Sequence, residues 1–239
     1  MSEVLVASDV SQSFGSVAVL DSVSLSLEAG TLAALVGPNG SGKTTLLRIL
    51  AGIRAPSDGD VSYRGSDTQR EVGYLPQQPR FRPSFTASET LAFYATLVGE
   101  APDNALDRVG LADAADRRVE ALSGGMTRLL GLAQATVGDP PVVILDEPAS
   151  GLDPRMRRRT FEVARELATE GAAVLLSSHD LALVEEWCDR VFVLDGGSLV
   201  AADSPDVLCD SYDVPHLRAV FEEALDQPAD QVEVLGVTE

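Results

Sequence analysis

The stretch ALVGPNGSGKTTLLRIL, residues 34–50, contains a phosphate-binding loop between a predicted buried strand and a predicted helix. Its centre, GPNGSGKT at 37–44, fits the pattern G-x-x-x-x-G-K-[ST] at every position. The glycines let backbone N–H groups turn toward a β-phosphate, and the helix N-terminus adds the positive end of its dipole. In this pattern Lys43 reaches the β- and γ-phosphates, and the Thr44 hydroxyl binds Mg²⁺. We therefore predict a nucleoside triphosphate site made by Gly37, Pro38, Asn39, Gly40, Ser41, Gly42, Lys43, Thr44 and Thr45.

The composition of the chain makes Lys43 unusual, because it is the only lysine among 18 basic residues. Against these stand 37 acidic residues, which give a net charge of −19. Such an excess repels polyanions and disfavours nucleic acid as a partner. The acids are spread along the chain, and spread acid with little lysine resembles the surface of salt-adapted (halophilic) proteins. At molar salt the Debye length is only about 3 Å, so the carboxylates would repel each other little. An acidic protein from ordinary salt is the alternative.

Around the loop the sequence predicts an α/β fold. Continuous apolar runs predict buried strands at 31–37, 141–148 and 172–178. Alternating patterns predict antiparallel strands at 3–10 and 17–27, with short strands near 59–63 and 71–75. Helices are predicted from Gly42 to Leu50, over most of 86–138, after Pro154, from Asp180 and over about 214–226, and a hairpin is predicted at 190–203.

We interpret the 239 residues as one domain with a helical insertion. Its predicted parts are a β subdomain and phosphate-loop core at about 1–77 and 139–209, a helical subdomain at about 78–138, and a C-terminal helix and tail at 210–239. No signal peptide is visible, and no apolar run approaches 18 residues, so any membrane role is expected to come through a partner. Cys188 and Cys209 are expected to be free thiols.

Two further segments contain residues that are expected to act at a nucleotide site. VVILDEP, at 142–148, is an apolar strand ending in two acids, of which Asp146 suits the Mg²⁺ shell and Glu147 is placed to polarise an attacking water. LSGGM, at 122–126, places Ser123, Gly124 and Gly125 at a helix start, which makes a second anion site. A plain serine cap is the alternative. The chain has one nucleotide loop but two helix starts suited to anions, so the second helix start is expected to contact the nucleotide of another subunit.

The motifs together resemble the nucleotide-binding subunit of ATP-binding cassette transporters over essentially the whole chain. The order is GPNGSGKT (37–44), YLPQ (74–77), LSGGM (122–126), VVILDE (142–147), SGLD (150–153) and SSHD (177–180). The resemblance implies a P-loop ATPase core with an N-terminal antiparallel β subdomain and an inserted helical subdomain. It implies ATP and Mg²⁺ as cofactors, and a head-to-tail homodimer on a membrane permease at the cytoplasmic face of the cell membrane.

The resemblance also implies roles for single residues. Phe14 would stack on adenine, although a core aromatic is the alternative. Gln77 would contact Mg²⁺ and the attacking water, and would link the site to the permease. His179 would contact the γ-phosphate, with a capping role as the alternative. Asp153 would bridge the dimer, and Ser123, Gly124 and Gly125 would face the γ-phosphate held by the opposing subunit.

One position departs from the family pattern. An arginine commonly follows the LSGGx stretch by three residues, but Leu129 stands there and Arg128 precedes it. One residue is a step of 100° around a helix, so Arg128 is not expected to make the usual contact. This departure puts turnover or dimer stability in question, but not ATP binding.

The sequence indicates the type of transporter less specifically than it indicates the family. The segments at 73–99 and 109–141 look like the ATPases of simple exporters, and LADAADRRV (111–119) is similar to the ATPase of copper-site maturation of nitrous oxide reductase. Drug, antibiotic and other exporters are alternatives. Residues 78–100 are expected to receive the permease, with Phe81, Phe85, Phe93 and Tyr94 either at that interface or in the core. A soluble cassette ATPase of translation or DNA repair would carry tandem cassettes or basic insertions, and a small-molecule kinase would not explain LSGGM or SGLD.

Overall fold

A computed structural model describes residues 2–65, 68, 70–100 and 104–226. Its main sheet has the strand order β5-β6-β7-β3-β8-β9. The strands are β5 (Val72–Leu75), β6 (Val142–Leu145), β7 (Ala173–Ser177), β3 (Leu32–Val36), β8 (Arg190–Asp195) and β9 (Ser198–Asp203). All neighbouring pairs are parallel except β8 with β9, which form the predicted hairpin. Every residue of β3, β6 and β7 is buried, as their continuous apolar sequences predict.

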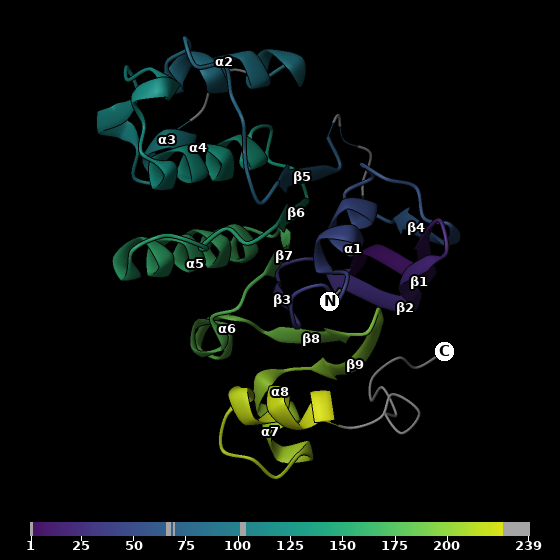
Figure 1. Cartoon of the computed structure of the whole chain (residues 1–239). Coiled ribbons are helices and arrows are strands. Elements are labelled where there is room, and N and C mark those ends of the chain that lie inside the picture. Colours follow the sequence, from purple (N-terminus) through teal and green to yellow (C-terminus); the bar gives the residue numbers. More distant parts are fainter. Residues whose placement is uncertain (1, 66–67, 69, 101–103, 227–239) are drawn as a thin grey trace.

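A second, antiparallel sheet has the order β2-β1-β4, with β1 at Glu3–Phe14, β2 at Val17–Glu28 and β4 at Asp58–Tyr63. The buried apolar residues of β1 and β2 share one cluster with the buried apolar residues of α1 (Lys43–Leu50). Figure 1 shows α1 lying between this sheet and the main sheet. The antiparallel sheet therefore supports the helix that begins inside the phosphate loop.

The predicted helical insertion is confirmed. It contains α2 (Ala87–Leu97), α3 (Ala105–Arg108), two short 3₁₀ turns at Ala112–Ala114 and Val119–Ala121, and α4 (Gly124–Thr136). A capping box fixes the start of α2, because Thr86 accepts from the N–H of Glu89 while Glu89 accepts from the N–H of Thr86. Helix α4 contacts β5 and β6, so the helical insertion is attached at the edge of the main sheet (Figure 1).

The remaining helices are α5 (Pro154–Thr169), α6 (Leu181–Trp187), α7 (Pro205–Ser211) and α8 (Leu217–Asp226). Helix α7 was not predicted, and α8 begins three residues later than expected, where the Glu185 carboxylate accepts from the N–H of Leu217 at 2.9 Å. The rest of the predicted tail, 227–239, lies outside the described residues. Cys188 and Cys209 are both free, as predicted. Within the described part of the chain, no helix is long and apolar enough to cross a membrane.

Candidate active site at the strand ends

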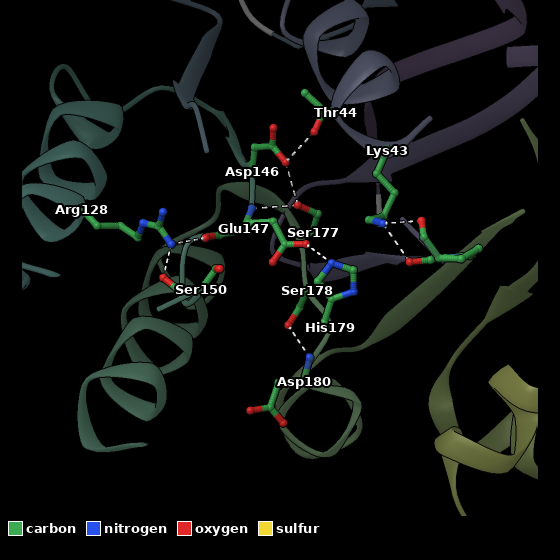
Figure 2. Close-up of polar contacts among 12 residues, drawn as sticks. Lys43, Thr44, Arg128, Asp146, Glu147, Ser150, Ser177, Ser178, His179 and Asp180 are labelled. Atoms are coloured by element: carbon green, nitrogen blue, oxygen red, sulfur yellow. Dashed lines mark hydrogen bonds and ion pairs between the residues drawn. The ribbon is translucent and has the colours of Figure 1, made fainter. Parts of the chain in front are cut away.

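The carboxyl ends of three adjacent strands hold most of the predicted site residues. The phosphate loop follows β3, the two acids follow β6, and the SSHD segment begins at the end of β7. Because β6, β7 and β3 are neighbours in the main sheet, these three segments meet at one edge. Figure 2 shows their side chains pointing toward one another.

The phosphate loop places Lys43 at the first position of α1, with only 7% of the residue exposed. Its Nζ donates to the carbonyl oxygens of Gly37 at 2.8 Å and Pro38 at 3.0 Å. Burial lowers the pKa of Lys43, while the carboxylates of Glu147 and Asp146 act in the opposite direction. A side chain at Gly37 would bring its Cβ to 2.2 Å from the Leu194 carbonyl oxygen, so glycine is required there.

Asp146 and Thr44 come together as predicted. The Thr44 hydroxyl donates to Asp146 Oδ1 at 3.3 Å, and the Ser177 hydroxyl donates to the same oxygen at 3.0 Å. Asp146 is 1% exposed, and its Oδ2 has no hydrogen-bond partner among the described residues. A buried carboxylate oxygen beside a hydroxyl fits a hard cation such as Mg²⁺. Gln77, the third predicted ligand, is exposed and lines a cavity that Thr44 also lines.

Glu147 is held in an uncommon conformation. Its φ is 53°, in the left-handed region, and the residue is 6% exposed. Its N–H donates to the Ser177 hydroxyl at 2.8 Å, and its Oε1 lies 2.8 Å from His179 Nε2. Burial raises the pKa of Glu147, and the charges of His179 and Lys43 oppose this effect. Strained backbone held by its surroundings is characteristic of functional sites.

Ser177 is the site residue that sequence reasoning missed. It is fully buried and bonds to both acids, so it fixes one relative to the other. A hydroxyl at the end of an otherwise apolar buried strand was the available signal, because a buried polar group requires a partner.

The strand ends surround a cavity of about 370 Å³. It is lined by Val19, Asn39, Gly40, Gly42, Lys43, Thr44, Thr45, Gln77, Glu147 and His179. Phe14 is not in this lining. It lies at the end of β1, is 44% exposed, and carries the Arg54 guanidinium over its ring at 4.8 Å. The alternative of a core aromatic at Phe14 is therefore wrong, and adenine stacking stays a prediction.

The second predicted anion site lies apart from this cavity. Ser123 is the N-cap of α4, and its hydroxyl accepts from the N–H of Met126 at 3.2 Å. Ser123 and Gly124 are exposed, and Gly125 is partly exposed. Asp153 caps α5 by accepting from the N–H groups of Arg155 and Met156, both at 3.0 Å. Both motifs therefore have local capping roles, which leave their surfaces open to a second molecule.

The loop between β3 and α1 and the acids after β6 define a P-loop nucleoside triphosphatase. The family model described as ABC transporter matches residues 20–150, and the chain belongs to that family. It is an ATP-binding, ATP-hydrolysing domain with the predicted α/β core, antiparallel β subdomain and helical subdomain.

Relatives and solved structures agree with this assignment. Nod factor export ATP-binding protein I of Rhizobium etli is 32% identical over an alignment of 252 positions, which covers 97% of this chain and 80% of that protein. The protein of the same name from Paraburkholderia xenovorans is 38% identical over 213 residues, covering 83% and 70%. A solved ATP-binding subunit of an ABC transporter matches with a TM-score of 0.83 at 27% identity, covering 92% of this chain and 99% of that chain. A dimeric cassette in a post-hydrolysis state, bound to ADP and Pi, shares the fold with a TM-score of 0.75 at 22% identity, covering 84% and 98%.

Proposed function

We propose that the chain is the ATP-hydrolysing subunit of an exporter whose membrane permease is a separate polypeptide. The similarity to proteins named for Nod factor export supports the direction of transport. The whole chain, 1–239, serves as one ATP-binding domain in this proposal. Cargo contacts belong to the permease, so a copper-processing role and other cargoes stay open.

Two copies of the chain associate head to tail around two ATP molecules in this proposal. Ser123, Gly124 and Gly125 do not line the cavity that contains Lys43 and Glu147, so they are free to face nucleotide bound by another copy. The exposed start of α4 supplies N–H groups and the positive end of a helix dipole for that purpose. The dimeric cassette with the same fold supports this arrangement.

Hydrolysis follows from the groups that converge at the strand ends. Glu147 accepts a proton from the attacking water, with His179 beside it to contact the γ-phosphate. Lys43 exchanges its contacts with loop carbonyls for phosphate oxygens. Thr44, Asp146 and Gln77 would hold Mg²⁺, which neutralises phosphate charge when bound. The observation that carries the proposal is the meeting of the phosphate loop, the buried acids and His179 at one edge of the sheet (Figure 2).

The test of this function is Glu147→Gln, which keeps the shape of the side chain and removes the base. We expect this variant to bind ATP, to hydrolyse it barely, and to accumulate as a dimer in size-exclusion chromatography with ATP. Glu222→Gln is the matched control, because it removes the same charge from an exposed position on α8. Rapid turnover by Glu147→Gln would remove Glu147 from its role.

We propose that the permease docks on the face of α2 and that the chain lies at the cytoplasmic side of the membrane. Phe93 packs edge-on against Tyr94 with ring centroids 5.5 Å apart, yet 44% of Phe93 is exposed. Leu97, one turn further along α2, is 66% exposed. Exposed apolar groups that lie together favour an interaction surface. We expect Phe93→Asp to prevent co-purification with the permease while ATP binding persists; retained co-purification would refute this docking face.

The acidic composition is proposed to be an adaptation to high salt. With a net charge of −19, repulsion within the folded chain should weaken as the Debye length falls. We expect the midpoint of thermal unfolding to rise between about 0.1 M and about 3 M KCl, where the Debye length drops from about 10 Å to below 3 Å. A midpoint that falls over this range would refute salt adaptation.

A further inference from the structure

Arg128 joins three segments that are far apart in the sequence. It lies on α4, and its Nη1 donates to the carbonyl oxygens of Glu147, at 3.1 Å, and Ser150. Its Nη2 donates to the carbonyl oxygen of Gln77 at 2.7 Å. The acceptors belong to the loop after β5 and to the turn between β6 and α5, which contains both Glu147 and Ser150. Figure 2 shows the guanidinium directed at the main chain of Glu147 and Ser150.

These contacts complete the fixation of the Glu147 backbone. Ser177 accepts from its N–H, and Arg128 donates to its carbonyl oxygen, so both main-chain polar groups are bonded to side chains. The left-handed φ of 53° is uncommon for a glutamate and requires such support. The direction of the Glu147 side chain therefore depends on contacts made from two sides.

The guanidinium is suited to this geometry. It presents five N–H donors in a rigid plane, whereas an ammonium group is a point charge on a flexible stem. Its neighbour Leu129 is 4% exposed and belongs to the apolar core, so the two residues perform different tasks. Helix α4 begins immediately after Ser123, and Arg128 lies five positions further along, which is about 7.5 Å along the helix axis.

We infer that Arg128 is a positioning residue that ties the start of α4 to the placement of Glu147 and of the Gln77 loop. This inference rests on the proposed hydrolytic function of Glu147. In the head-to-tail dimer, the start of α4 faces the nucleotide of one site while Glu147 acts in the other. A rigid guanidinium between them would make the geometry of one site depend on that of its neighbour.

The experiment compares Arg128→Gln and Arg128→Lys with the unaltered chain, measuring ATP turnover, KM, binding of a fluorescent ATP analogue and denaturant unfolding. We expect Arg128→Gln to lower kcat by about 10- to 100-fold, since small misplacements of a catalytic group have effects of this size. KM and analogue binding should change little, because Lys43 and the phosphate loop remain intact. Arg128→Lys should fail to restore kcat, because an ammonium cannot span the three carbonyls.

Arg64→Gln is the control, because Arg64 pairs with Glu3 on the antiparallel sheet and should leave all four measurements unchanged. Turnover of Arg128→Gln within about twofold of the control would overturn the inference, because misplacement is expected to cost far more. Full rescue by Arg128→Lys would also overturn it, by showing that charge alone matters. A loss of turnover matched by an equal loss of folded protein would assign Arg128 a purely structural role. Failure of the unaltered chain to hydrolyse ATP would instead refute the proposed function.

Discussion

Ser177→Ala tests whether one buried hydroxyl organises the acid pair. The Ser177 hydroxyl donates to Asp146 Oδ1 at 3.0 Å and accepts from the N–H of Glu147 at 2.8 Å. Ser177 is 0% exposed, so water cannot replace the hydroxyl without rearrangement. A buried donor left unsatisfied costs about 1–3 kcal/mol, and we expect the free energy of unfolding to fall by that amount. Urea unfolding followed by fluorescence of Trp187, the single tryptophan, measures the change.

The same substitution should lower ATP turnover, because Glu147 loses the contact that fixes its N–H in a strained conformation. Ser178→Ala is the matched control. Its hydroxyl accepts from the N–H of Asp180 at 3.0 Å and contacts neither acid, so turnover should be kept. A Ser177→Ala chain that loses less than about 0.5 kcal/mol, the usual effect of a neutral substitution, and that turns over normally would refute the reasoning.

Three further predictions concern other parts of the chain. Lys43→Arg should abolish ATP binding or turnover in high salt, because a planar guanidinium is too bulky for the buried ammonium position; normal hydrolysis would contradict this. Gly73→Ala should lower the free energy of unfolding by about 1–3 kcal/mol, since its Cβ would lie 1.9 Å from the Ala135 carbonyl oxygen; an unchanged denaturation midpoint would exclude the clash. Burial raises the pKa of Cys188 from 9.0 to about 12, so iodoacetamide at neutral pH should label Cys209 well before Cys188. Labelling of both cysteines at equal rates would refute the burial effect. In the unfolded chain the Cys188 thiol has the lower pKa and loses its proton at a lower pH than in the folded chain, so the free energy of unfolding should fall as pH rises from 9.0 toward 12.

Most of the fold followed from local sequence patterns, and its one missed helix shows where such patterns fail. Strands β3, β6 and β7 are continuous apolar runs, which only burial on both faces explains. Helix α7 has seven residues, too few for a helical period to emerge, and unlike the equally short α6 it does not lie in the alternation of strands and helices. Its start did carry a signal, because Ser204 is the N-cap and Pro205 the first helical residue.

The site residues fall into two groups: those that belong to a recognisable sequence motif, and those that bond to main-chain atoms of other segments. Lys43, Asp146 and Glu147 lie in segments whose order predicts that they meet. Ser177 and Arg128 act on N–H and carbonyl groups of distant segments, and every residue except proline, which lacks the N–H, offers both groups. No residue pattern therefore marks their partners. One helical step of 100° separates Arg128 from Leu129, and only the packing of α4 shows that the first faces the site and the second the core.

Lys43 and Arg128 both donate to backbone carbonyl oxygens, one through an ammonium group and the other through a guanidinium group. Lys43 has three donors, and two of them contact loop carbonyls at 2.8 and 3.0 Å. Arg128 contacts three carbonyls from two segments, which requires the wider fork of a guanidinium. Exchanging the two cations should therefore fail for opposite reasons: an arginine at position 43 is too large for the loop, and a lysine at position 128 has too short a span. In a chain whose other basic residues are all arginine, the single lysine stands where only a compact ammonium fits.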